Sequence, residues 1–147
     1  MWMGLSVMVL WLAGAQMVRA EGDTLYGSLI MATVNEDEAR RAPVPPELRS
    51  QAEALEAVFG YNEFRILAQK RQPLTTATED WMVRGRGFSL KVDTKYPKMN
   101  GYALGLELLK EQQVLVEAEV QISRERPCFI RGPFVGRGQV IILLMVE

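Results

Sequence analysis

The sequence has no histidine and only one cysteine among its 147 residues. Without histidine, the chain cannot build a Ser-His-Asp or Cys-His catalytic centre, a histidine-ligated metal site or an imidazole pH switch. One cysteine cannot form an internal disulfide or a thiolate zinc site. The formal net charge of −1 provides no overall field that attracts a polyanion. These absences exclude several enzyme classes and predict that the protein uses no cofactor and binds no nucleic acid.

Motifs that would supply another catalytic chemistry are also missing. None of the serines after residue 20 lies in a Gly-x-Ser-x-Gly motif. The glycine-rich segment 132–138 lacks the Lys-Ser/Thr pair of a Walker A loop, and no helix is expected after it. Glu117 and Glu119 are spaced as on the solvent face of a strand, and residues 36–38 lack the spacing of an EF-hand loop. We therefore predict a non-enzymatic protein with no catalytic or metal-binding residue.

The first 20 residues have the pattern of a secretory signal peptide. The stretch from Met1 to Val18 carries no charged side chain, and compact residues precede a cleavage site after Ala20. Cleavage after Ala15 and retention of the segment as an uncleaved anchor are the alternatives. We predict a signal peptide over residues 1–20 and a single domain over residues 21–147. The protein is then exported, to the periplasm or beyond, and after cleavage is not stably inserted in a membrane.

One segment has the pattern of an amphipathic helix. Three prolines in residues 43–46 favour a stiff extended link before it. Leu48, Leu55 and Phe59 then recur at helical spacing, and Gly60 stands where a left-handed C-cap is expected. We predict one helix over about residues 46–59, with a narrow apolar stripe that packs on a sheet.

The rest of the chain reads as strands with short connections. Alternating or continuous apolar residues predict strands over 24–34, 61–69, 80–84, 88–92, 102–109, 114–123, 128–131 and 139–147. In segment 114–123, every second residue from Val114 to Ile122 is apolar and is expected to face the core. Segment 139–147 is apolar almost throughout, which predicts a central strand buried on both faces. We predict an α+β fold, a mainly antiparallel sheet of about six to eight strands with one packed helix.

Two arginine- and glycine-rich turns supply the candidate contact residues. Arg84 and Arg86 lie in a predicted hairpin turn, and Arg131 and Arg137 flank the glycine-rich segment. If these turns meet at one end of the sheet, they form a small basic patch, to which Tyr96 is the candidate aromatic addition. The structural alternative is a pair of ordinary connections in which the glycines supply positive φ angles.

Cys128 begins a short predicted strand after Pro127. In such a position the side chain is typical of a small buried hydrophobe. The alternative is a reactive or intermolecular thiol, because an exported chain with one cysteine has no internal partner for it.

The combination of a helix-closing motif and a C-terminal strand motif resembles small, uncharacterised exported proteins of bacteria. The resemblance rests on Phe59-Gly60-Tyr61-x-x-Phe64 and on Arg131-Gly132-Pro133 followed by Gly136-x-Gly138-Gln139-Val140-Ile141. It covers nearly all of the chain after the predicted leader. It implies location in the cell envelope and a fold of one helix with a β-meander, and it transfers no catalytic residue.

These observations lead to two functional hypotheses. The first is an exported non-enzymatic domain that acts by protein–protein contact, for example as an accessory subunit of an envelope or secretion assembly, with edge strands available for pairing. The alternative is a periplasmic domain that binds a small ligand or glycan through Tyr96, Tyr102 and the loop that contains Arg131 and Arg137. An exposed apolar patch favours the first hypothesis, and a deep pocket with converging arginines and aromatics favours the second.

Overall fold

The computed structural model describes residues 23–74, 81–98 and 101–147. The predicted signal peptide and its alternative cleavage sites lie outside these residues. The described part forms two four-stranded antiparallel sheets and one α-helix. The first sheet has the order β2 (Glu63–Pro73), β1 (Thr24–Thr33), β8 (Gly138–Val146), β7 (Cys128–Val135). The second has the order β3 (Trp81–Gly85), β4 (Phe88–Lys98), β5 (Gly101–Lys110), β6 (Gln113–Ile122).

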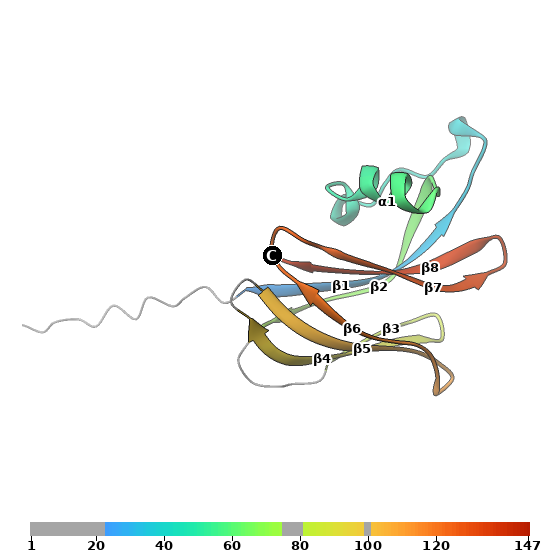
Figure 1. The fold of residues 1–147 in the computed structure, drawn as a ribbon. Coiled ribbons are helices and arrows are strands. Elements are labelled where there is room, and N and C mark those ends of the chain that lie inside the picture. The colour runs from blue at the N-terminus through green and yellow to red at the C-terminus, as the bar shows by residue number, and fades with distance from the viewer. Residues whose placement is uncertain (1–22, 75–80, 99–100) are drawn as a thin grey trace, which may run out of the picture.

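The two sheets stack face to face, and helix α1 (Ala52–Phe59) covers the outer face of the first sheet (Figure 1). The strands follow chain order within the second sheet, and β1 pairs with β8 inside the first. The chain crosses between sheets from β2 to β3 and from β6 to β7, and each of these pairs of strands is in contact. The coarse prediction of mainly antiparallel β-structure with one helix is confirmed, whereas the division into two sheets was not anticipated.

The two inner strands of the first sheet, β1 and β8, are buried on both faces. The inner face of this sheet packs against the second sheet through residues such as Leu29 and Ile142, and its outer face packs under the helical layer through residues such as Ile30 and Ile141. Only Met145 of the nine residues of β8 is not classed as buried. The prediction of a central strand buried on both faces is therefore confirmed, and its cause is the continuous apolar sequence.

The second sheet is buried on one face only. In β6, Val116, Ala118 and Val120 are half-buried, whereas the intervening residues are exposed, as the alternation predicts. Val114, also predicted to face the core, is exposed instead. The pairing steps from Leu108↔Val116 to Leu109↔Val114, so one extra residue of β6 forms a bulge there. Because a bulge shifts the alternation by one residue, Val114 turns to the outer face.

The helix is shorter than predicted. Residues 46–48 form a separate 3-10 helix, and α1 begins only at Ala52. Gln51 has φ −114° and ψ −5°, which interrupts regular helical geometry between the two pieces. Leu48 and Leu55 are nevertheless both fully buried on the first sheet, so the predicted apolar stripe is confirmed. Gly60 ends α1 in the left-handed conformation at φ 76°, as expected.

Three strands extend past their predicted ends. Strand β2 continues to Pro73, β4 continues to Lys98, and β7 continues through Pro133 to Val135. Strands β2 and β7 are the outer strands of the first sheet, the position in which sheets tolerate proline. A register shift between Arg131 and Phe134 accommodates Pro133. In residues 23–74, 81–98 and 101–147, no helix is long and apolar enough to cross a membrane.

Candidate functional site

Three hairpin turns lie together at one end of the sandwich (Figure 1). They are the β3–β4 turn at residues 86–87, the β5–β6 turn at 111–112 and the β7–β8 turn at 136–137. We call this the hairpin end. The strand registers require this arrangement, because β4 and β5 pair at Phe88↔Lys110 beside two of the turns. The opposite end, which we call the terminal end, holds Asp23 and Glu147.

Within residues 23–74, 84–93 and 101–147, the large hydrophobic side chains that are exposed all lie toward the hairpin end. They are Val34 after β1, Val58 in α1, Val114 and Leu115 at the start of β6, and Phe134 and Val135 at the end of β7. Phe134 is the most exposed of them, at 75%. Strands β6 and β7 are neighbouring edges of the two sheets. Val114 lies on the outer face of the second sheet, whereas Phe134 pairs with Gln139 on the helix-covered side of the first sheet.

Phe134 is paired with a buried polar residue of the neighbouring strand. It pairs with Gln139, whose side chain is 2% exposed and lies on the helix-covered face. The Gln139 Nε2 donates a hydrogen bond of 3.0 Å to the Gly132 carbonyl, and Tyr61 Oη donates one of 3.1 Å to Gln139 Oε1. Gln139 is thus buried and hydrogen-bonded under the helix, whereas Phe134, its partner in the register, is exposed.

Arg131 connects α1 to the first sheet. Its guanidinium lies 4.6 Å from the centre of the Phe59 ring. Its Nη2 donates a hydrogen bond of 3.3 Å to the Val58 carbonyl, and its Nη1 donates one of 3.3 Å to Gln139 Oε1. The residue that the sequence indicated as a ligand contact therefore has a structural role at the C-terminus of the helix.

The structure brings only some of the candidate contact residues together. Arg84 and Arg86 lie at the hairpin end on the second sheet, and Arg137 lies there on the first sheet; all three are exposed. The register Tyr96↔Ala103 instead places Tyr96 on the part of β4 nearer the terminal end. The basic patch is therefore spread over two sheets, and the backbone of Tyr96 is remote from it.

The glycines of segment 132–138 serve two different purposes. Gly136 has φ 58° and forms the turn, as the sequence suggests. Gly132 and Gly138 do not have positive φ angles; they allow close approach of backbones instead. A Cβ on Gly132 would lie 2.7 Å from the Val140 carbonyl oxygen, and one on Gly138 would lie 2.8 Å from that of Ala32. The segment is thus a close-packed hairpin rather than an open anion-binding loop.

A polar cluster joins the two sheets at the terminal end. Tyr102 Oη donates a hydrogen bond of 2.7 Å to Asp23 Oδ2, and Arg124 Nε donates one of 2.7 Å to Asp23 Oδ1. These two bonds, that from Tyr102 first, hold the pKa of Asp23 below its usual value. Burial, and then the bond to Asp23, raise the pKa of Tyr102. Sequence reasoning missed this cluster, because its members are distant in the chain and belong to no motif.

The outer face of the second sheet is hollowed into a shallow groove of about 340 Å³. Gly105 lacks a side chain at its centre, and the charged residues around it are Lys91, Asp93, Glu107, Glu117 and Glu119. The register places Glu107 directly opposite Glu117 on adjacent strands of one face. These carboxylates therefore lie side by side on one face of the sheet and do not face each other across a cleft. Among the described residues, no group of three or more acidic or cysteine side chains is placed to hold a metal ion.

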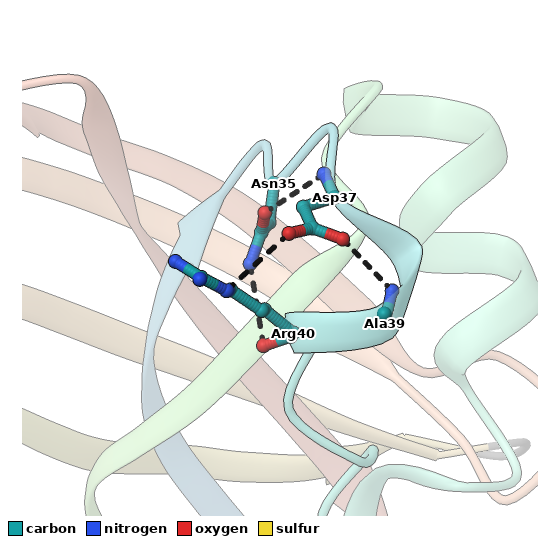
Figure 2. A network of polar contacts seen from close by, with 4 residues as sticks. All are labelled: Asn35, Asp37, Ala39 and Arg40. Atoms are coloured by element: carbon teal, nitrogen blue, oxygen red, sulfur yellow. Dashed lines mark hydrogen bonds and ion pairs between the residues drawn. The ribbon is translucent and has the colours of Figure 1, made fainter.

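The acidic run 36–38 is part of a loop that is closed by its own polar contacts (Figure 2). Asp37 accepts a hydrogen bond of 3.1 Å from the Ala39 N–H and pairs with Arg40 at 3.5 Å. Asn35 Oδ1 accepts a bond of 3.1 Å from the Asp37 N–H. Asp37 thus caps the short 3-10 helix Glu38–Arg40.

Cys128 is half-buried and packs against the core between the sheets. Burial raises the pKa of its thiol, which disfavours the reactive thiolate. Of the two interpretations drawn from the sequence, these observations favour the small hydrophobe.

Comparison with models of known families, with curated proteins and with solved structures gives no match for this chain. The resemblance to small exported bacterial proteins and the predicted export therefore remain predictions.

Proposed function

We propose that this protein is an exported, non-enzymatic domain that acts by protein–protein contact, and that the hairpin end is its contact surface. The predicted signal peptide supports export. The contact role is supported by the absence of recognised catalytic motifs and by the nature of the exposed surface. A role as accessory subunit of an envelope or secretion assembly fits a domain of this kind.

The observation that carries the proposal is the one-sided distribution of exposed apolar side chains. Isolated exposed hydrophobic residues are normal on a protein surface, but they are then scattered. Here Phe134, at 75% exposure, lies toward the same end as the other exposed large hydrophobic side chains of residues 23–74, 84–93 and 101–147. Burying one such side chain in an interface contributes about 1.5–3 kcal/mol, so an aromatic residue at this position is suited to be an anchor.

The alternative of a small-ligand site receives less support from the geometry. Arg131 is engaged by Phe59 and Gln139, and Tyr96 lies away from the arginine-bearing turns. The hydroxyl of Tyr102, the other aromatic candidate, is bonded to Asp23 at the terminal end. The groove on the second sheet is lined by carboxylates and Lys91, not by arginines and aromatic rings.

The proposal is tested by crosslinked capture from the envelope fraction of cells that make the protein naturally. We expect Phe134→Ser and Val114→Ser each to reduce capture of the specific partner by about tenfold or more, because each removes an apolar contact. Both side chains are exposed, so stability should stay within about 0.5 kcal/mol of the parent protein.

The matched control is Gln121→Ser, an exposed position further along β6. It should leave capture unchanged. Capture of a reproducible partner that none of these substitutions affects would exclude the hairpin end as the contact surface. Recovery of no reproducible partner would contradict the contact role itself.

A further inference from the structure

We infer that a protein partner presents an extended segment in which basic and apolar side chains alternate, and that this segment pairs as an added strand with β6 between Val116 and Ile122. The site rests on the proposed contact function and specifies the chemistry of the partner. Three features of β6 support it: a regular edge, an apolar inner face and an acidic outer face.

The edge of β6 is open to a further strand. Within residues 23–74, 81–98 and 101–147, β6 forms a ladder with β5 alone. Its sequence contains no proline, and its pairing with β5 is regular from Val116 to Ile122. The backbone N–H and C=O groups on the outer side of such an edge are a template for pairing with another chain.

The other three edge strands each carry a feature that opposes pairing. Strand β3 has only five residues, and β7 contains Pro133 beside a register shift. In β2, Arg65 pairs with Met31, which packs against the core between the sheets, so a charged side chain points to the inner side of this edge. Pairing of a partner strand is therefore most favourable along β6.

The inner face of β6 offers apolar surface to an added strand. Val116, Ala118 and Val120 pack against the core between the two sheets, but they are only partly buried. Side chains of an added strand that point to the same side would lie beside these residues and cover them. Every second residue of the partner segment is therefore apolar.

The outer face of β6 is acidic. Glu117 and Glu119 are exposed on this face, and the sequence of β6 contains no lysine or arginine. Glu107 of β5 lies directly opposite Glu117, and like charges in this arrangement destabilise a sheet. Gly105 lies opposite Glu119 at the centre of the shallow groove, which leaves room for a long side chain. Lysine or arginine in the remaining positions of the partner would place positive charge beside Glu117 and Glu119.

Two other occupants fit this edge less well. A second copy of this chain that paired through its own β6 would bring Glu117 and Glu119 against the same carboxylates. An anionic membrane surface would meet the same repulsion and offers no backbone groups to a strand edge. A basic extended segment satisfies both the charges and the edge.

The experiment measures binding of three synthetic peptides of equal length to the whole protein, as recovered after its natural processing. The first alternates lysine with valine, the second alternates glutamate with valine, and the third has proline in place of the central valines of the first. We expect the first peptide to bind about tenfold or more tightly than the others, because it alone combines positive charge with an unbroken row of backbone N–H groups. Hydrogen exchange should show protection of β6 amides by this peptide.

Combined Glu117→Lys and Glu119→Lys substitution should weaken binding of the lysine–valine peptide by about tenfold or more. Both side chains are exposed, so the fold should tolerate the change. The matched control is combined Glu53→Lys and Glu56→Lys substitution, which makes the same change of charge at exposed positions of α1. It should leave the affinity for the peptide unchanged.

Equal binding of the three peptides, equal effects of the β6 and α1 substitutions, or binding without protection of β6 amides would each overturn the inference. Protection of β6 amides by self-association of the protein alone would assign the edge to a second copy and overturn it as well. If the peptide results fail while Phe134→Ser still reduces partner capture, the β6 site is wrong and the proposed contact function stands. If the peptide results hold and the envelope yields no partner, the β6 site stands and the function proposed for the hairpin end fails.

Discussion

The two ends of this sandwich differ in the side chains that they carry: hydrogen-bonded polar groups at the terminal end and exposed apolar groups at the hairpin end. At the terminal end, Asp23 accepts hydrogen bonds from Tyr102 and Arg124, and the backbones of Thr24 and Glu147 bond to each other at 2.7 and 3.0 Å. At the hairpin end, Phe134, Val135, Val114 and Leu115 are exposed. The comparison shows a cross-sheet polar cluster at the terminal end, in addition to the apolar core, and exposed apolar side chains at the hairpin end.

The largest effect on stability is expected at the terminal end. Replacing Asp23 with alanine removes the acceptor shared by Tyr102 and Arg124, whereas the side chain itself is only 27% exposed. We expect the free energy of unfolding to fall by about 1–3 kcal/mol, as for other hydrogen bonds to a charged group. Urea denaturation measures this change.

The control for this substitution is Asp37→Ala, which removes an ion pair in an exposed loop. It should change stability by less than about 0.5–1 kcal/mol. If Asp37→Ala destabilises as much as Asp23→Ala, the terminal cluster has no special part in holding the sheets.

The same cluster should make stability depend on acid. The pKa of Asp23 is lowered by Tyr102 and then by Arg124, so in the acid range the unfolded chain takes up its proton before the folded one. The contribution is fully present above the unfolded pKa of about 3.8 and is lost as the pH falls through the lower folded pKa. Asp23→Asn should remove this part of the acid dependence in denaturation experiments. An unchanged pH profile would show that the carboxylate is not stabilised in the folded state.

A smaller effect is expected where the helix meets the sheet. Arg131→Ala removes the guanidinium that lies on Phe59 and bonds to the Val58 carbonyl. We expect a loss of about 1 kcal/mol and faster hydrogen exchange in α1, because an exposed cation–π contact and a carbonyl bond disappear. Arg137→Ala, at an exposed turn, is the matched control and should leave exchange in α1 unchanged.

The smallest effect is expected in the β5–β6 turn. Glu111 and Gln112 have φ 50° and 69°, angles that favour glycine or asparagine. Gln112→Gly should therefore stabilise the protein by about 0.5–1 kcal/mol, measured as a higher denaturation midpoint. A loss of stability would mean that the Gln112 side chain makes a contribution greater than the cost of its backbone angle.

The sequence was informative about the fold where the pattern is local. The apolar run of β8 predicts a strand buried on both faces, and Gly60 predicts the end of α1. The alternating pattern wrongly predicted that Val114 faces the core. The bulge that turns it outward depends on pairing with β5, and the alternation in the sequence does not reveal it. The division into two sheets was missed for the same kind of reason, since it is decided by crossings between strands and not within them.

The candidate site was less predictable than the fold. Arg86 and Arg137 lie in turns, as their neighbouring glycines predict. The sequence left open whether these turns meet at one end, because the pairing of the strands decides this. Arg131 is a possible contact residue from the sequence, and only the structure shows that its guanidinium lies on the Phe59 ring. Phe134 was not singled out, because the motif that contains it does not reveal that Gln139 occupies the adjacent buried space.

The most direct test is photo-crosslinking of the native protein in its natural envelope from single positions. A photoreactive phenylalanine analogue replaces Phe134 in one variant and Arg126, exposed at the terminal end, in another. If the hairpin end is the contact surface, position 134 crosslinks to a specific partner protein and position 126 does not. Equal crosslinking from both positions, or crosslinking from position 126 alone, would contradict that claim.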